Sequence, residues 1–292
     1  MDLQIANNWK ELAKPIAETV LKPGILEIKT DSGLFILKTK NEKQELRKSL
    51  YLLQAIRRED VPIEVPVESL SGELYVDHGN KRYCLFERIV GDPINTGFEH
   101  INWEIFGNAI ARLHLAFDKI AIDIAFPEMQ FVDAFPWLTG GKRQSVLSCD
   151  YLSYLSDSLA KIEALQKELI HRDPHPGNII FKDGKLAGFI DLDLSTMGPR
   201  IFDLVYCSTA MLSDLFSGQR EVWVYKRKEI VVGYQRLCHL SDLELSLLLP
   251  MAVYIQQLFT RFYENQRDDE KSAHNAMIAK WLFESNESRP MV

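Results

Sequence analysis

The sequence has few cysteines, no long apolar run and no surplus of basic residues. Its four cysteines show no C-x-x-C pair and no histidine partner at zinc spacing, which argues against a structural zinc site. The most apolar stretch, 245–253, is much shorter than a membrane span and contains Pro250. A net charge of −7 argues against a nucleic-acid partner.

The N-terminal residues also lack the basic region and long apolar core of a signal peptide. Together with cysteines that are expected to be free thiols, this predicts a cytoplasmic protein without a membrane partner. The 292 residues are 46% hydrophobic and 26% charged, which is typical of a soluble globular protein. That length suits one two-lobed domain or two small domains. The sequence says nothing about the oligomeric state.

The most informative segment contains H-R-D-P-H-P-G-N at 171–178 and F-I-D-L-D at 189–193. Asn178 follows Asp173 by five positions, and Asp191 follows Asn178 by thirteen. Two β-rich runs on either side of Asp183-Gly184 predict a hairpin between them. Each fragment alone could be explained without catalysis, the first as a turn that favours Asp and Asn and the second as a strand that ends in solvated carboxylates. In this order and joined by a short hairpin, they indicate the catalytic loop and metal-binding strand end of a phosphotransferase.

The residue types suit that reaction. Phosphoryl transfer needs positioning and charge neutralisation, and a carboxylate such as Asp173 can orient a hydroxyl group and take its proton. Mg²⁺ prefers oxygen ligands, which the Asn178 amide and the Asp191 carboxylate supply. Asp193 is either a second metal contact or a solvated strand end, and we favour the metal.

These motifs resemble the aminoglycoside phosphotransferase and choline kinase-like family, whose loop is H-G-D-x-x-x-x-N; Arg172 stands in the place of the glycine. The segments G-P-R-I-F-D-L at 198–204 and F-G-N-A-I-A-R-L-H at 106–114 are also similar to family segments, and the likeness runs roughly over residues 25–215. The resemblance implies an α+β, bilobal protein kinase-like fold, with a small β-rich N-terminal lobe and a larger, mainly helical C-terminal lobe. It implies ATP as phosphoryl donor, Asp173 as base, and Asn178 and Asp191 as Mg²⁺ ligands.

The resemblance also implies a nucleotide site. Lys38 matches the strand lysine that holds the α- and β-phosphates. The hinge-like segment C-L-F-E-R-I-V-G at 84–91 implies that backbone groups of Glu87 and Ile89 meet the adenine edge, with Phe86 behind it. The glutamate that pairs with the lysine aligns with Ser49, so Glu45, one helical turn away, is the predicted replacement. No glycine-rich phosphate loop precedes Lys38.

Hydrophobic periodicity predicts the elements. We expect a helix over 1–20, a hairpin from 26–30 and 34–39, a helix over 43–58, a loop or edge strand over 61–67, and a hairpin from 73–76 and 82–86. A boundary over 90–97 would divide the chain into an N-terminal nucleotide-binding lobe, 1–89, ending in the hinge, and a C-terminal catalytic and acceptor-binding lobe, 90–292. Helices are expected at about 102–118, 150–167, 219–238, 242–264 and 272–284.

Several other polar residues have more than one interpretation. Asp203 either accepts hydrogen bonds from the catalytic loop or is a helix N-terminal carboxylate favoured by the helix dipole. His171 is expected to pack beneath the loop and His114 to lie at a helix end, and His175 either contacts the acceptor or is an ordinary loop residue. Aromatic residues such as Phe259 and Tyr263 are either core residues or faces for an organic cation.

The preferred hypothesis is an ATP- and Mg²⁺-dependent kinase acting on a hydroxyl of a small molecule such as an aminoglycoside, choline or homoserine. The alternatives are a protein Ser/Thr kinase and a catalytically impaired binding protein. About ten residues separate Asp193 from Asp203, too few for the peptide-binding platform of a protein kinase. The missing glycine loop motivates the binding-protein alternative, and the presence of Lys38 and Asp173 argues against it.

Overall fold

The computed structural model describes residues 3–94, 102–120, 123–142 and 147–284. The chain forms two compact units. The N-terminal unit comprises Met1–Pro93, Ile120–Ile124 and Ile179–Leu194; the C-terminal unit comprises Ile94–Lys119, Ala125–Asn178 and Ser195–Val292. The division at 89/90 stays a prediction, and part of its boundary segment, 95–97, lies outside the described residues. No described helix is long and apolar enough to cross a bilayer.

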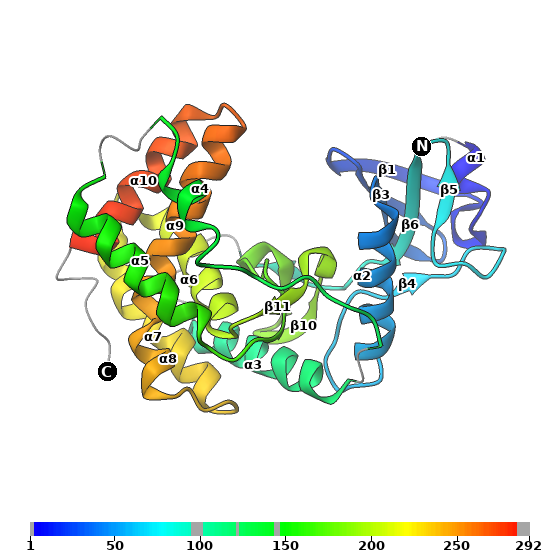
Figure 1. Ribbon diagram of the computed structural model, residues 1–292. Coiled ribbons are helices and arrows are strands. Elements are labelled where there is room, and N and C mark those ends of the chain that lie inside the picture. The colour runs from blue at the N-terminus through cyan, green and yellow to red at the C-terminus, as the bar shows by residue number, and fades with distance from the viewer. Residues whose placement is uncertain (1–2, 95–101, 121–122, 143–146, 285–292) are drawn as a thin grey trace. The chain divides into compact units, whose positions relative to one another are not determined.

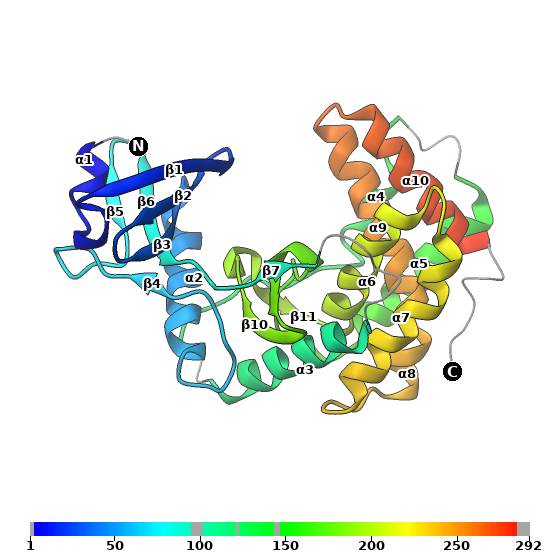
Figure 2. The same cartoon turned by 180° about the vertical axis from the view of Figure 1, so that it is seen from behind.

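The N-terminal unit is built on an antiparallel sheet (Figure 1). Its strands are β1 (Pro15–Lys22), β2 (Ile25–Thr30), β3 (Gly33–Lys40), β6 (Lys81–Glu87) and β4 (Pro66–Val67) in that spatial order, and β5 (Val76–His78) also pairs with β6. Both predicted hairpins are confirmed within a few residues. Helix α2 (Lys43–Ile56) lies beside the sheet in both views (Figure 2) and buries the predicted face of Leu46, Leu50, Leu53 and Ile56.

The predicted helix over 1–20 is wrong. The segment forms a short α1 (Leu3–Ala6), a 3-10 turn (Lys10–Leu12) and then strand β1. Pro15 explains the change, because a proline disfavours helical geometry at the residue before it. Trp9 and Leu12 are buried against Ile28 of the sheet, whereas the side chains of the edge strand β1 are exposed.

A second small sheet belongs to the same unit. It contains β7 (Asp92–Pro93), β9 (Ile179–Lys182) and β10 (Lys185–Phe189), so the hairpin that was predicted from the motif is present. Asp183 and Gly184 form its turn with positive φ angles of 51° and 73°. A 3-10 turn, Leu192–Leu194, follows β10. This hairpin therefore carries Asp191 and Asp193 beyond its second strand.

The C-terminal unit is mainly helical. Its helices are α3 (Glu104–Lys119), α4 (Phe135–Thr139), α5 (Cys149–Glu163), α6 (Ile201–Leu215), α7 (Arg220–Gln235), α8 (Asp242–Ser246), α9 (Leu248–Asn265) and α10 (Asp269–Glu284), and β8 (Glu168–Ile170) pairs with β11 (Thr196–Gly198). The kinase-like α+β architecture that was predicted is confirmed.

Two helix predictions in this unit need correction. The helix expected over 242–264 is two helices, α8 ending at Ser246 and α9 beginning at Leu248, because Pro250 has no N–H for a continuous helix and is tolerated only in a first turn. Helix α6 was not predicted. Most of its residues are buried on every side, so its sequence has no polar face to reveal a helical period.

Glycine permits close packing between α3 and α7. A Cβ atom on Gly107 of α3 would overlap the Ile230 carbonyl oxygen, and a Cβ on Gly233 of α7 would overlap the Glu104 carbonyl oxygen. Backbone atoms have little freedom to move away from such an overlap. The two helices can therefore approach this closely only because both positions lack a side chain.

We predict that Gly107→Ala lowers the free energy of unfolding by about 3 kcal/mol, because an added methyl group forces the α3 and α7 backbones apart. Urea unfolding followed by circular dichroism measures the change. Gly218→Ala is the matched control, since no atom lies within 4 Å of the position of its Cβ. Equal stability of the two variants would contradict the close packing.

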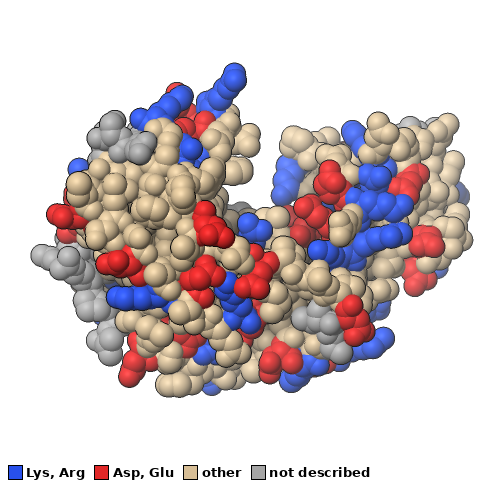
Figure 3. Space-filling view, viewed as in Figure 1, with Lys and Arg blue, Asp and Glu red and all other residues tan. Residues whose placement is uncertain are grey.

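Basic and acidic side chains are interspersed over the face of both units that Figure 3 shows. Charged side chains form ion pairs within each unit, such as Arg200 with Glu244 at 2.7 Å and Arg88 with Glu27 at 2.6 Å. Each of these pairs compensates its own charges locally.

Candidate functional site

The predicted base, Asp173, lies in the loop between β8 and the 3-10 turn Pro176–Asn178, and we call residues 171–178 the Asp173 loop. The Tyr206 hydroxyl donates to Asp173 Oδ1 at 2.6 Å. Asn178 Nδ2 donates to Asp173 Oδ2 at 3.1 Å and to its backbone carbonyl at 2.9 Å. Both carboxylate oxygens therefore accept a hydrogen bond, which fixes the orientation of the side chain.

Tyr206 keeps its proton in this arrangement. Burial raises the pKa of its hydroxyl, and the neighbouring Asp173 carboxylate raises it further. The hydroxyl thus acts as a donor to Asp173 at neutral pH. The amide nitrogen of Asn178 donates its hydrogen bond to Asp173. The amide oxygen, which is the atom that could bind a metal, is therefore left for a different partner.

The first interpretation of Asp203 is confirmed. This buried carboxylate, on the first turn of α6, accepts from the backbone N–H of His171 at 2.8 Å through Oδ2 and of Arg172 at 2.8 Å through Oδ1. His114 is not at a helix end as expected: it is buried within α3, and its Nε2 lies 2.9 Å from Asp203 Oδ2. His171 is fully buried beneath the loop, as predicted.

Backbone strain accompanies this anchoring. Arg172 has a φ of 70°, in the left-handed region that favours glycine. Its N–H is one of the two held by Asp203, so the carboxylate holds the backbone in its unfavourable conformation. Strain of this kind persists only where surrounding contacts enforce it, and it concentrates at functional sites.

Lys38, the predicted phosphate lysine, is buried on β3 and has a different partner from the expected one. Its Nζ lies 2.7 Å from Glu64 Oε2 and 3.7 Å from Asp191 Oδ1. Glu64 Oε1 also accepts from the Asp191 backbone N–H at 2.8 Å. The prediction that Glu45 pairs with Lys38 is therefore wrong. The loop before β4 places Glu64 against Lys38, and Glu45 makes no ion pair with this lysine among the described contacts.

Asp191 and Asp193 are surrounded by lysines. Asp191 Oδ1 lies 3.5 Å from Lys40 Nζ, and its Oδ2 lies 4.0 Å from Lys22 Nζ. Burial of Asp191 favours its neutral form, but Lys38 and Lys40 outweigh burial and hold the pKa of this carboxyl far below its usual range. We call Lys22, Lys38, Lys40, Glu64, Asp191 and Asp193 the lysine–carboxylate cluster.

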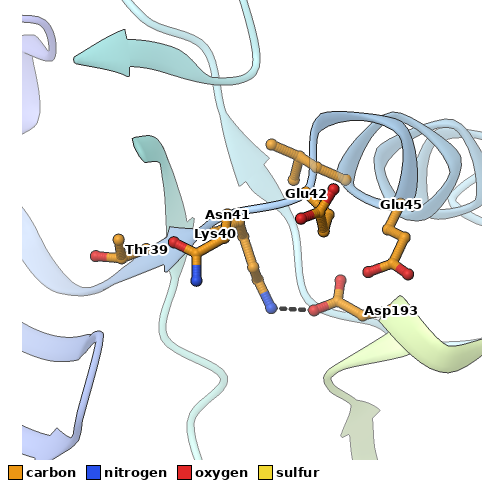
Figure 4. A pocket seen from close by; sticks show the side chains of 7 residues that line it. Thr39, Lys40, Asn41, Glu42, Glu45 and Asp193 are labelled. Atoms are coloured by element: carbon orange, nitrogen blue, oxygen red, sulfur yellow. Dashed lines mark hydrogen bonds and ion pairs between the residues drawn. The ribbon is translucent and has the colours of Figure 1, made fainter. Parts of the chain in front are cut away.

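Lys40 forms a close ion pair with Asp193, and this pair borders a small pocket (Figure 4). Thr39, Asn41, Glu42, Glu45 and Leu46 complete its lining. Burial opposes the charge on Lys40, yet Asp193 and Asp191 raise its pKa. Glu45 thus belongs to the same pocket as Asp193 instead of contacting Lys38.

The predicted adenine-binding segment begins at the end of β6, which includes Phe86 and Glu87, and continues beyond the strand to Ile89. Phe86 is buried, and Lys38 Nζ lies 4.8 Å from the centre of its ring. The Glu87 N–H donates to the Val65 carbonyl at 3.1 Å, so its carbonyl oxygen is the group that remains for an adenine contact. Ile89 makes no backbone hydrogen bond with another described residue. One acceptor and one donor are thus offered, which is the pairing an adenine edge requires.

A tight turn takes the position of a glycine-rich loop. Strands β1 and β2 are joined at Pro23-Gly24, where Gly24 has a φ of 79° and its carbonyl accepts from the Thr39 N–H at 2.7 Å. The turn is too short to offer a row of backbone amides to phosphates. Lys22, at the end of β1, places an ammonium group beside Asp191 instead.

Comparison with known proteins agrees with this chemistry. Residues 25–234 match the model of the phosphotransferase enzyme family. The chain belongs to this family. It is therefore a phosphotransferase, and the predicted resemblance is confirmed.

Three proteins that are similar to this phosphotransferase have names that refer to different acceptors. Homoserine kinase of Rhodospirillum rubrum is 28% identical over 267 residues, 86% of this chain and 80% of that protein. Serine/threonine protein kinase RdoA of Salmonella typhimurium is 24% identical over 205 residues, 66% of this chain and 58% of that protein. The structure of a microcompartment-associated aminopropanol kinase is 16% identical, with a TM-score of 0.76 over 99% of both chains.

Proposed function

We propose that this phosphotransferase moves the γ-phosphoryl group of ATP to a hydroxyl group of a small molecule, with Mg²⁺ as the metal. The observation that carries the proposal is the Asp173 carboxylate, held through both oxygens by Tyr206 and Asn178. A carboxylate fixed in this way is suited to orient a hydroxyl group. The names of the homoserine and aminopropanol kinases support a small acceptor.

On the nucleotide side, Lys38 holds the α- and β-phosphates, and the backbone of Glu87 and Ile89 contacts adenine beside Phe86. Asn178, Asp191 and Asp193 supply Mg²⁺ ligands. Their hard oxygen atoms fit this cation, and the low pKa of Asp191 keeps its carboxylate ionised at neutral pH. When bound, the metal neutralises charge on the phosphates. Lys40 is ion-paired with Asp193 through Oδ2, so this lysine and the metal would compete for that oxygen.

The chemical step needs one base. The acceptor oxygen attacks the γ-phosphorus while Asp173 takes the hydroxyl proton, the bond to the β–γ bridging oxygen breaks, and ADP leaves. Tyr206 and Asn178 keep Asp173 aimed at the hydroxyl. The free cysteines support the cytoplasmic location that we propose for this reaction.

A screen of hydroxyl compounds with ADP release as readout tests the proposal. Homoserine, choline, ethanolamine, 3-aminopropan-1-ol and an aminoglycoside form the panel, and casein serves as a protein acceptor. We expect Mg²⁺-dependent ADP release with at least one small compound. Phosphorylation of casein alone would favour a protein kinase, as in the RdoA relative. No turnover and no binding of Mg²⁺–ATP would favour an impaired binding protein.

Asp191→Asn is predicted to remove the Mg²⁺ dependence of nucleotide binding. A ligand at about 100 times its Kd adds about 2.7 kcal/mol to the stability of the native state. We therefore expect Mg²⁺ to enhance the thermal stabilisation by ATP in the wild type and to have little effect in the variant. Asp183→Asn is the control. Asp183 has a positive φ angle of 51°, like Asp191 at 65°, but its side chain is exposed and lies in the hairpin turn. An unchanged Mg²⁺ effect in Asp191→Asn would exclude Asp191 as a ligand.

A further inference from the structure

Three lysine side chains of the N-terminal unit converge on the carboxylate of Asp191. Lys38 Nζ and Lys40 Nζ lie 3.7 Å and 3.5 Å from its Oδ1, and Lys22 Nζ lies 4.0 Å from its Oδ2. The register of the sheet explains this convergence, because Lys22 on β1 pairs with Ile25 on β2, which pairs with Lys38 on β3. Residues paired across neighbouring strands share one face of a sheet, and Lys40, two positions after Lys38, lies on that face as well.

The three lysines differ in how firmly they are held. Lys38 donates to Glu64 Oε1 at 2.9 Å and lies 2.7 Å from Oε2, and its side chain is only 5% exposed. Lys40 is 22% exposed and shares its charge between two carboxylates. Lys22 is 61% exposed, and its ion pair is the longest of the three to Asp191. Lys38 is thus fixed by its own counterion, whereas the ammonium groups of Lys40 and Lys22 have more freedom to turn to another anion.

The turn between β1 and β2 is anchored beside the same lysines. The N–H of Thr39, the residue between Lys38 and Lys40, donates to the Gly24 carbonyl at 2.7 Å. This bond ties the end of β1, and with it Lys22, to β3. It also directs a carbonyl oxygen of the turn toward β3. Phosphates are bound by donors, and at this place the lysine side chains supply them.

The charges of the lysine–carboxylate cluster favour an anion once a metal is bound. The cluster contains three lysines and three carboxylates, so its charges balance. A divalent cation on Asp191 and Asp193 leaves a surplus of positive charge, and these carboxylates then attract Lys40 and Lys22 less strongly. In phosphoryl transfer the metal lies against the β- and γ-phosphate oxygens. The two freed ammonium groups therefore lie beside the place where the phosphates bind.

We propose that Lys40 and Lys22 are further phosphate-binding residues of the nucleotide site, which supply from side chains the donors that a glycine-rich loop supplies from its backbone. This role deepens the proposed function and rests on it, since ATP is the phosphoryl donor there. Lys40 is the stronger contact, because it is the less exposed of the two. The affinity for the nucleotide thus depends on side-chain charges around its phosphates.

Calorimetric titrations with a non-hydrolysable ATP analogue and with adenosine test this role. At saturating Mg²⁺, Lys40→Met is expected to raise the Kd of the analogue by about 10-fold or more, as for the loss of a hydrogen bond to a charged group. Lys22→Met is expected to raise it by about 2- to 5-fold, as for an exposed ion pair. The Kd of adenosine should stay unchanged in both variants, because adenosine carries no phosphate. Lys40→Arg keeps the charge and should retain most of the affinity.

Lys29→Met is the matched control. Lys29 is an exposed lysine of β2 in the same sheet, four positions from Ile25, and its replacement changes the net charge of the protein equally. Its Kd values should equal those of the wild type. Misfolding does not explain a change in Lys22→Met, because the Lys22 side chain is mostly exposed. The melting temperature of each variant without nucleotide checks this directly.

The Mg²⁺ requirement separates phosphate binding from a role of Lys40 in positioning Asp191 and Asp193. Because Lys40 and the metal compete for Asp193, Lys40→Met should need no more Mg²⁺ than the wild type for half-maximal enhancement of analogue binding. A higher Mg²⁺ requirement, with affinity restored by excess Mg²⁺, would overturn the phosphate contact, and so would unchanged Kd values in Lys40→Met and Lys22→Met. The titrations need no acceptor, so either result leaves the proposed function standing. A wild type that does not bind the analogue would overturn both.

Discussion

Asp173→Asn is expected to reduce kcat by about 10²- to 10⁴-fold, the range that general base catalysis contributes. Asparagine keeps the shape of the side chain and an oxygen that can accept from Tyr206, but it cannot take a proton from the acceptor hydroxyl. Most of the proposed nucleotide-binding residues belong to the other compact unit, and Asn178 keeps its hydrogen bond to the Asp173 backbone carbonyl, so the Kd of Mg²⁺–ATP should change little. Single-turnover ADP formation and calorimetric titration with a non-hydrolysable ATP analogue measure the two quantities.

Tyr206→Phe is the matched comparison for this result. It retains the ring that contacts Phe259 and removes only the hydroxyl group 2.6 Å from Asp173 Oδ1. As a positioning residue, Tyr206 should affect kcat about 10-fold, less than the base itself, because Asn178 still holds the carboxylate. If Asp173→Asn turned over at the wild-type rate, the base would have to be another group, and Tyr206→Phe would then also be neutral.

Local sequence patterns predicted much of this molecule. The hairpin that carries Asp191 was visible in its alternating residues and in Asp183-Gly184, and α2 in the spacing of its apolar face. The loop that holds Asp173 was visible as a motif of chemically suitable residues at fixed spacing. In each case neighbouring residues decide the structure, so a short window contains the information.

Partners that come together from distant positions could not be predicted in this way. Glu64 lies 26 residues from Lys38, in a loop whose sequence signals only two prolines. Tyr206 lies on α6, a helix that is buried on almost all sides and therefore shows no amphipathic pattern. For both residues the contact depends on the packing of separate elements, which pattern reasoning does not see. The pairing of Lys40 with Asp193 has the same origin, since 153 positions separate them.

The anchoring of the Asp173 loop by Asp203 leads to the second large expected effect. Asp203→Asn replaces an acceptor oxygen by a donor NH₂ group in a fully buried site where His171 N–H, Arg172 N–H and His114 meet. At least one buried donor then loses its partner and faces another donor. We expect the free energy of unfolding to fall by about 2–5 kcal/mol, the cost of leaving buried polar and charged groups uncompensated. Urea unfolding measures this loss.

The same substitution should reduce activity beyond its effect on stability. Asp203 holds Arg172 at its positive φ, so weakening that bond lets the backbone relax and turns Asp173 away from Tyr206. At a temperature where the variant is fully folded, kcat is expected to remain at least about 10-fold below the wild type, because displacement of a catalytic group by 1 Å is already costly. Asp214→Asn on the same helix is the control, since Asp214 is exposed and should change stability by less than about 0.5 kcal/mol. A stable Asp203→Asn variant with normal kcat would show that the loop keeps its conformation without this carboxylate.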